Sequence, residues 1–349
     1  MKFLIASIAI VLTGIGIMFW IHNTQGNNAD NSKHPQSVDV ETFPDGSEVG
    51  TQFGSDRVKD GQPAGPVAFD GERAMSYLRA ICDLGPRISG SKAMRLQQEL
   101  IKKHFESLGA TVVFQSFEAK QTSVAGKVPM TNIIVSFLPE KKRRAILCSH
   151  YDTRPIADQE LDPRNWKKDF VSANDGGSGV AFLMEMGNHM KDMKTQVGVD
   201  FVIFDGEEYI FETEGARRDR YFIGSEYFAK TWKADKNRCQ YSAAILLDMI
   251  AGANIQFPLE SHSWNRFPNL CREVWGIAAE QKATAFRSFV KHSVLDDHIE
   301  LQKVGIPAID IIDFDYPHWH KLSDTPVNCS AVSFNQVAKV LSVWLQRTK

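Results

Sequence analysis

The chain has 349 residues, of which 43% are hydrophobic, so it can bury one large core or two modest ones. Its formal net charge of −2 at pH 7 gives no global basis for binding nucleic acid or an anionic surface. The 24 glycines and 14 prolines are ordinary numbers for this length, so we expect most of the chain to fold.

An apolar segment without charged residues runs from Phe3 to Ile21, directly after Met1-Lys2. As a helix rising about 1.5 Å per residue, it is long enough to cross a hydrocarbon layer of about 30 Å. Trp20 lies near its far end, where interfacial aromatic residues are typical, and no small-residue cleavage site follows. Residues 1–21 are therefore interpreted as a signal-anchor helix that contacts the membrane through residues 3–21 and leaves the rest of the chain outside the cytoplasm. A cleaved signal peptide would instead make the protein secreted.

Residues 22–65 are rich in Asn, Asp, Gly, Ser, Gln and Pro and show no apolar period, which is typical of a polar stalk or linker. The remaining residues, 66–349, are predicted to form one catalytic α/β domain. The chain has five cysteines and no CxxC motif, and an odd number cannot all pair within the chain. We therefore expect buried thiols rather than a disulfide framework.

Helical and strand-like patterns alternate from about residue 68 onward. Helices are predicted over 72–82, 93–108, 180–193, 220–232, 265–281 and 333–346. Strands are predicted over 111–117, 132–138, 145–149, 200–204, 243–249 and 308–312. The basic run 141–144 is interpreted as the turn of a hairpin between two of these strands. The alternation predicts a three-layer α/β/α sandwich with a central mixed, mostly parallel sheet.

Residues that can bind metal follow several of the predicted strands. In chain order they are His150 and Asp152, Asp175, Glu207 and Glu208, Asp248, and His320. Sites in open α/β sheets form beyond the carboxyl ends of the strands, and imidazole and carboxylate groups are zinc ligands. Each short motif occurs by chance in many chains, so the prediction of a zinc site depends on all of them occurring in this order.

Two pairs of residues that are close in the sequence suggest that one member binds the metal and the other has a different role. In Glu207-Glu208, one carboxylate can bind metal while its neighbour acts as general base or acid. In the pair formed by His150 and Asp152, the carboxylate can orient a metal-binding imidazole without touching the metal itself.

With these motifs in place, the chain from about Ala68 onward resembles the zinc-exopeptidase superfamily, peptidase family M28. That superfamily joins di-zinc aminopeptidases to glutaminyl-peptide cyclotransferases. Two further segments resemble its early part, Leu84-Gly85-Pro86-Arg87 and Thr131-Asn132-Ile133-Ile134.

The two branches imply different sites. An aminopeptidase-like site would bind two zinc ions, with Glu207 as general base. Its ligands would be His150, Asp175, Glu208, Asp248 and His320. A cyclotransferase-like site would bind one zinc ion through Asp175, Glu208 and His320. There Glu207 would carry a proton from the substrate amine to the departing ammonia.

The cyclotransferase branch implies three further residues. Asp248 and Asp297 would form a pair of carboxyl groups beside Glu207, and Trp319 would form a wall of the substrate pocket. Two carboxyl groups held close together cannot both ionise easily and would share a proton.

Cyclisation of an N-terminal glutamine to pyroglutamate is favoured over hydrolysis of N-terminal residues. Leu295-Asp296-Asp297-His298-Ile299, the Trp319-His320 pair and the segment 209–221 resemble the cyclotransferases, whereas Asn174-Asp175-Gly176-Gly177-Ser178-Gly179 resembles the aminopeptidases. A non-enzymatic, membrane-tethered binding domain is the alternative of another class. The expected partner is a peptide or protein N-terminus, while the number of zinc ions, the physiological substrate, any disulfide pairing and the oligomeric state stay open.

Overall fold

The computed structural model describes residues 65–349. The predicted signal-anchor helix over 1–21 and, apart from Gly65, the predicted stalk over 22–65 lie outside these residues. Within 65–349, every helix is too short or too polar to cross a bilayer.

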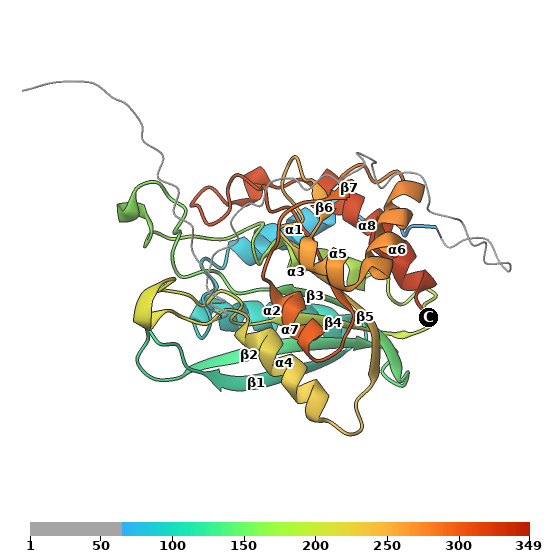
Figure 1. The fold of residues 1–349 in the computed structure, drawn as a ribbon, viewed down its shortest axis with the longest axis horizontal. Helices are drawn as coiled ribbons and strands as arrows, with labels where there is room; N and C mark the ends of the chain where they lie inside the picture. Colours follow the sequence, from blue (N-terminus) through green and yellow to red (C-terminus); the bar gives the residue numbers. More distant parts are fainter. Residues whose placement is uncertain (1–64) are drawn as a thin grey trace, which may run out of the picture. The chain divides into compact units, whose positions relative to one another are not determined.

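A six-stranded sheet forms the centre of the fold (Figure 1). Its strands are β1 (Thr111–Ala119), β2 (Val128–Phe137), β3 (Arg143–His150), β4 (Gly198–Phe204), β5 (Gln240–Asp248) and β8 (Ala308–Ile312). They lie in the order β1-β2-β4-β3-β5-β8, with β3, β4, β5 and β8 parallel and β2 antiparallel to both its neighbours. The predicted mixed, mostly parallel sheet is confirmed.

Helices cover both faces of this sheet, as the predicted sandwich requires. They are α1 (Gly71–Cys82), α2 (Lys92–Ser107), α3 (Ser178–Gly187), α4 (Ile223–Ala234), α5 (Ser261–Arg266), α6 (Pro268–Glu280), α7 (Asp297–Lys303) and α8 (Ala331–Arg347). Short 3-10 turns lie at η1 (Pro163–Asn165), η2 (Gly215–Arg217) and η3 (Pro326–Asn328), and β6 (Phe257–Leu259) pairs with β7 (Phe286–Val290) in a separate small sheet.

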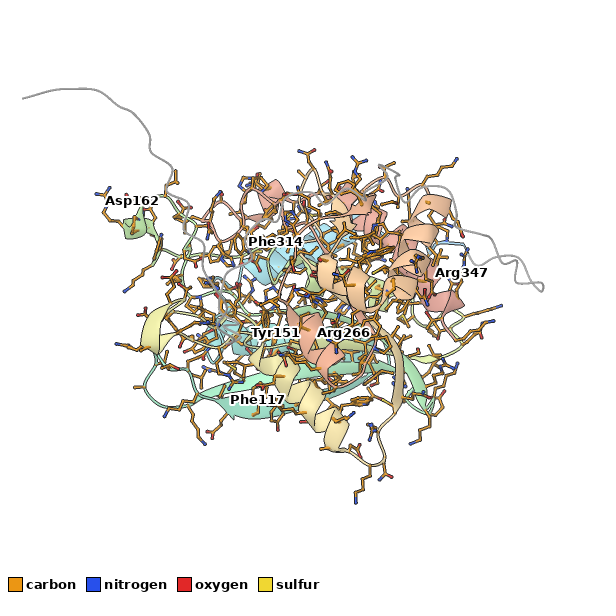
Figure 2. All side chains as sticks on the ribbon, viewed as in Figure 1. Phe117, Tyr151, Asp162, Arg266, Phe314 and Arg347 are labelled. Atoms are coloured by element: carbon orange, nitrogen blue, oxygen red, sulfur yellow. The ribbon has the colours of Figure 1, made fainter. Side chains whose placement is uncertain are left out.

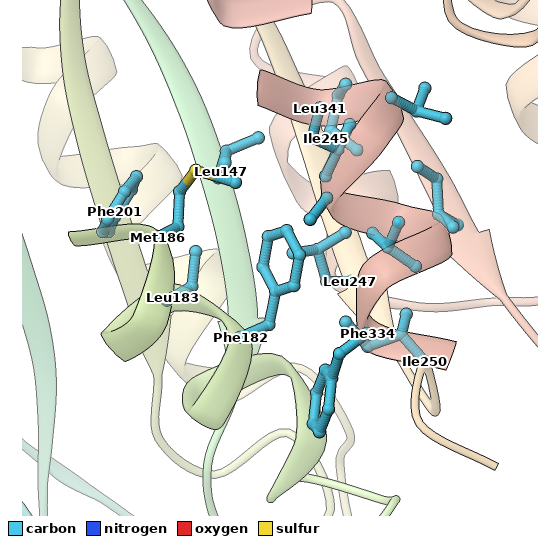
Figure 3. Packing of buried hydrophobic residues seen from close by; sticks show 14 of the residues in the cluster. Leu147, Phe182, Leu183, Met186, Phe201, Ile245, Leu247, Ile250, Phe334 and Leu341 are labelled. Carbon is cyan, nitrogen blue, oxygen red and sulfur yellow. The ribbon is translucent and has the colours of Figure 1, made fainter. Parts of the chain in front are cut away.

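Alternate residues of the central strands pack into two hydrophobic cores, one on each face of the sheet. In β3, Leu147 packs with Phe182 of α3 and Leu341 of α8, as Figure 3 shows. Its neighbour Ile146 points to the other face and packs with Phe228 of α4. Because successive side chains of a strand point to opposite faces, an apolar strand such as β3 is buried on both sides. Because β3, β4, β5 and β8 are parallel, their carboxyl ends, and the polar residues that follow them, lie at one edge of this buried sheet.

Two predicted helices differ from the structure. The helix predicted over 180–193 ends at Gly187, where a side chain would lie 2.7 Å from Cε1 of Phe105. The helix predicted over 265–281 is two helices, α5 and α6, which meet at Phe267. Pro268 has no backbone N–H to continue the first helix, and it occupies the first turn of the second, where that donor is not needed.

The five cysteines are free thiols, in agreement with the prediction. Cys82, Cys148 and Cys271 are buried, while Cys239 and Cys329 are half-buried. Burial raises the pKa of the Cys271 thiol to about 12, which leaves it in the unreactive protonated form.

The predicted hairpin at residues 141–144 is wrong. β4 lies between β2 and β3, so the strands on either side of this basic run are not paired with each other. Arg144 is not a solvated turn residue either, because its guanidinium forms a buried ion pair with Asp200 of β4 at 2.6 Å. Tyr241 donates a further hydrogen bond to the same carboxylate. Arg144 therefore supports the pairing of β3 with β4, while Lys141 and Lys142 lie in the connection before β3.

Breaking this buried pair should destabilise the fold strongly. Asp200→Asn leaves the Arg144 charge buried and unpaired, which typically costs about 3–5 kcal/mol of unfolding free energy. Urea unfolding followed by circular dichroism measures the loss. As a control, Glu118→Gln interrupts the exposed ion pair with Lys127 and should change the midpoint little. Equal midpoints for the two variants would contradict the role assigned to Arg144.

Candidate metal centre and active site

The predicted metal-binding residues converge at the carboxyl ends of the parallel strands. β3 ends at His150 and β5 ends at Asp248, while Glu208 follows β4 closely. Asp175 lies just before α3, and His320 lies in the segment after β8. Because parallel strands end at the same edge of a sheet, residues separated by up to 170 positions become neighbours there.

Asp175 is at the centre of this cluster. One carboxylate oxygen, Oδ1, lies 3.1 Å from Nε2 of His150, and the other, Oδ2, lies 3.5 Å from Nε2 of His320. The same nitrogen of His320 is 2.9 Å from Oε2 of Glu208, and Nε2 of His150 is 3.3 Å from Oδ1 of Asp248. Two groups of three possible ligands therefore share Asp175, and within each group the ligand atoms lie within 4.8 Å of one another.

The donor atoms of these groups suit a metal ion. Oδ2 of Asp175 and Oδ1 of Asp248 are buried and have no hydrogen-bond partner. Buried polar atoms are normally satisfied, and unpaired carboxylate oxygens in an apolar interior are costly unless a cation lies close by. Burial raises the pKa of Glu208 to about 7, and the charge of Asp175 adds to this rise. Imidazole and carboxylate donors in this number match a zinc site.

The turn that carries Asp175 depends on two glycines. Gly176 has a φ of +72°, and a side chain there would lie 2.6 Å from the carbonyl oxygen of Asp152. At Gly177 a side chain would lie 2.4 Å from the carbonyl oxygen of Ala173. Only glycine fits both positions, so the Asp-Gly-Gly sequence lets the backbone approach β3 closely enough to bring Asp175 next to His150.

Asp152 mainly fixes the backbone beside the site. Its two oxygens accept hydrogen bonds from the backbone N–H groups of Glu207 and Glu208, each at 3.1 Å. Its distance to Nδ1 of His150 is 3.6 Å, longer than a normal hydrogen bond. The carboxylate expected to orient His150 thus chiefly holds the Glu207-Glu208 pair.

Glu207 lies beside the metal-binding cluster. Its Oε2 is 3.8 Å from Nδ1 of His150, and its side chain is 13% exposed, which leaves it accessible to a small substrate. Burial raises the pKa of its carboxyl well above the usual range, His150 opposes this rise, and Glu208, Asp296 and Asp297 add to it. The structure therefore brings the predicted proton carrier next to the candidate ligands.

Two more buried carboxyls, Asp296 and Asp297, interact electrostatically with Glu207. Burial raises the pKa of Asp296 well above its usual range, and the charges of Asp248 and Asp297 raise it further. Burial also raises the pKa of Asp297 to about 7, but here Ser225 and His150 are the main neighbours. Asp297, the predicted partner of Asp248, is thus buried next to a second acidic residue, Asp296, and its pairing with Asp248 stays a prediction.

Trp319 lies beside the last ligand. Its ring is 4.1 Å from the ring of His320 and 5.1 Å from the ring of Phe314, measured between centroids. It packs with a small apolar cluster that includes Val294 and Tyr316 and stays half-buried. A half-buried aromatic group next to a metal ligand can contribute to a substrate pocket.

Sequence reasoning missed the residues that support the site without binding the metal. Asp324 accepts hydrogen bonds from the backbone N–H groups of Asn174 and Asp175 and from the Tyr316 hydroxyl. Asp158 accepts a hydrogen bond from His320, and its carboxylate also pairs with Arg154. These aspartates lie in segments without regular pattern, so only their contacts reveal them.

Comparison with known proteins gives consistent matches. The model of the family described as "Peptidase family M28" matches residues 132–345. The solved glutaminyl cyclase of Fimbriiglobus ruber is 46% identical with a TM-score of 0.79, and the match covers 83% of this chain and 100% of that chain. A solved leucine aminopeptidase precursor from Bacteroides thetaiotaomicron is 28% identical with a TM-score of 0.74, covering 80% and 98% of the two chains. The glutaminyl-peptide cyclotransferase of Drosophila melanogaster is 25% identical over 283 residues, which are 74% of this chain and 75% of that protein.

Proposed function

Because this chain belongs to peptidase family M28, we propose that it cyclises the N-terminal glutamine of peptides to pyroglutamate and releases ammonia. The observation that carries the proposal is the convergence of Asp175, Glu208 and His320, with the Glu207 carboxyl within 4.8 Å of Glu208 and 3.8 Å from His150. The similarity to the Fimbriiglobus ruber glutaminyl cyclase, at 46% identity over that whole chain, supports it. The catalytic unit is the α/β domain of residues 66–349.

We assign zinc to the site formed by Asp175, Glu208 and His320, with one ion as the proposed number. When bound, zinc polarises the carbonyl of the substrate's γ-amide and stabilises the negative charge that develops on its oxygen. His150 and Asp248 could hold a second ion, since they share Asp175 with the first group. Cyclisation needs no metal-activated water, so this second group is not required for the proposed reaction.

Glu207 moves the proton during ring closure. The substrate's α-amino nitrogen attacks the carbon of the γ-amide, a new C–N bond closes the five-membered ring, and the bond to the amide nitrogen breaks. Glu207 accepts a proton from the attacking amine and delivers it to the leaving nitrogen, which departs as ammonia. Burial and the charges of Glu208, Asp296 and Asp297 raise the pKa of Glu207, which makes its carboxylate a stronger base for this transfer.

Trp319 is assigned to the pocket that receives the glutamine side chain. Its ring lies against His320, so a group bound there would lie next to the proposed zinc ligand. A small pocket closed by an aromatic face suits an uncharged N-terminal residue and excludes water from the reacting atoms.

Offering two peptides to one preparation tests the function. We expect a peptide with N-terminal glutamine to lose 17 mass units, about the mass of ammonia, and to become resistant to Edman degradation. A matched peptide with N-terminal leucine should stay intact, which mass spectrometry of the same samples will show. Release of free leucine would instead establish an aminopeptidase, in keeping with the 28%-identical aminopeptidase precursor. Turnover of neither peptide would favour a binding domain.

A further inference from the structure

His320 has a fixed orientation because both of its ring nitrogens have partners. Its Nδ1 lies 2.9 Å from Oδ1 of Asp158, a distance at which the ring N–H donates to the carboxylate. Its Nε2 then faces Glu208 at 2.9 Å and Asp175 at 3.5 Å. The contact with Asp158 therefore selects the tautomer whose Nε2 lone pair points into the proposed metal site.

Arg154 connects Asp158 to a second proposed ligand. Its Nη2 donates a hydrogen bond to Oδ2 of Asp158 at 2.7 Å. Its Nη1 lies 3.7 Å from Oε2 of Glu208, whose other oxygen accepts the backbone N–H of Arg154 at 3.2 Å. Arg154 and Asp158 are almost fully buried, so these contacts are little screened by solvent. One arginine thus contacts Glu208 directly and His320 through Asp158.

The backbone of the same segment also holds His320. The N–H of Gln159 donates to the carbonyl oxygen of His320, and the Glu160 carboxylate accepts the N–H of Leu322. His320 has a φ of +51°, a left-handed conformation that costs a residue with a side chain about 1–3 kcal/mol unless its surroundings impose it. The segment of residues 154–160, which we call the clasp, makes these contacts with residues 320–322.

A third element is joined to the clasp. Arg154 Nη2 also donates to the hydroxyl of Tyr221 at 3.1 Å, and its guanidinium lies 5.6 Å from the centre of the Tyr221 ring. Tyr221 ends the segment that follows Glu207-Glu208 and leads into α4. Nη2 donates to both Asp158 and Tyr221 while the planar guanidinium lies near the Tyr221 ring, an arrangement that a compact ammonium group does not reproduce.

We propose that Asp158 and Arg154 are positioning residues that hold His320 and Glu208 in the geometry that binds zinc. The proposal rests on the assignment of His320 and Glu208 as zinc ligands under the proposed function. Neither residue touches the substrate. Asp158 sets the orientation of the His320 ring, and Arg154 balances the Asp158 charge while fixing Glu208.

Within the clasp, the negative charge of Asp158 is paired with the positive charge of Arg154. The Asp158 carboxylate lies 2.7 Å from the Arg154 guanidinium and 2.9 Å from the His320 ring, so its charge is paired on both sides. Removing Arg154 entirely would leave that charge buried and unpaired, so a charge-conserving variant is the better test of its role.

Zinc affinity measured by competition with a chromophoric chelator tests the proposal without relying on any activity. Asp158→Asn removes the charge behind His320 and should weaken zinc binding by about 10–100-fold, as is typical when the partner of a metal-binding histidine is lost. Arg154→Lys keeps the charge but loses the planar guanidinium group, and we expect a smaller decrease in zinc affinity. Excess zinc should restore most of the turnover of both variants, with KM for the peptide little changed.

The control is Asp162→Asn, the same substitution in the same loop. Asp162 pairs with Arg164 at the exposed tip, where Figure 2 labels it, and it does not contact the ligands. It should leave zinc affinity unchanged. Zinc affinities of Asp158→Asn and Arg154→Lys equal to that of the wild type would overturn the proposal, even if thermal unfolding of the zinc-free proteins showed lower stability. If both variants bound zinc more weakly, as expected, but the wild type did not cyclise the peptide, only the proposed function would be contradicted.

Discussion

Glu207→Gln should lower kcat for cyclisation by about 10²–10⁴-fold while zinc stays bound. Glutamine keeps the size of the side chain but can neither accept the proton of the attacking amine nor return it to the leaving nitrogen. The proposed ligands Asp175, Glu208 and His320 are untouched by the change, so metal content should stay the same. Ammonia release under saturating peptide measures kcat, and metal analysis of the same sample measures zinc.

The matched control for this variant is Glu214→Gln. Glu214 is exposed in the segment that follows Glu207-Glu208, and it makes no side-chain hydrogen bond at the start of its 3-10 turn. Its turnover should equal that of the wild type. If Glu207→Gln kept normal turnover, proton transfer would have to be assigned to another carboxyl, and Asp296 would be the first to examine because burial raises its pKa too.

Asp175→Asn should abolish zinc binding at micromolar zinc and turnover with it. Both oxygens of Asp175 face possible ligands, Oδ1 towards His150 and Oδ2 towards His320. An amide offers one neutral oxygen and one NH2 group, so it both removes the negative charge and places a donor where a metal ion would lie. The expected loss of zinc affinity is more than about 100-fold, larger than for a residue that only orients a ligand.

Equilibrium dialysis against buffered zinc, followed by metal analysis, measures that loss. Asp192→Asn is a suitable control, because Asp192 is exposed and lies outside the cluster. Zinc binding by Asp175→Asn at the wild-type affinity would remove Asp175 from the ligand set and with it the common member of both groups. Loss of zinc with retained turnover would show that the reaction does not need the metal.

Local patterns in the sequence predicted most of the architecture. The six predicted strands all exist, and β8 spans Ala308–Ile312 as expected, because buried parallel strands appear as short apolar runs. The separate helices α5 and α6 were predicted as one because apolar spacing continues across Phe267, and only the missing N–H of Pro268 divides them. Short elements such as α7 and the β6–β7 pair were missed, since few residues carry a weak periodic signal.

The order of the strands could not be predicted in the same way. The basic run 141–144 was predicted as a solvated turn because charged residues usually lie at the surface. The insertion of β4 between β2 and β3 brings Asp200 next to Arg144, and that distant carboxylate is what makes burial of the arginine possible. Pairing partners far apart in sequence leave no trace in local composition.

For the candidate site, the sequence by itself determined which residues can bind metal and that they follow the ends of strands. This was possible because ligand chemistry belongs to residue type, and because parallel strands bring their carboxyl ends to one edge. Only the tertiary structure decided how the side chains are directed. Asp296 caps the start of α7 and Asp297 is its first residue, and both are buried, which packing decides and local sequence does not. Likewise Asp158 meets His320 only because the fold joins segments 162 positions apart.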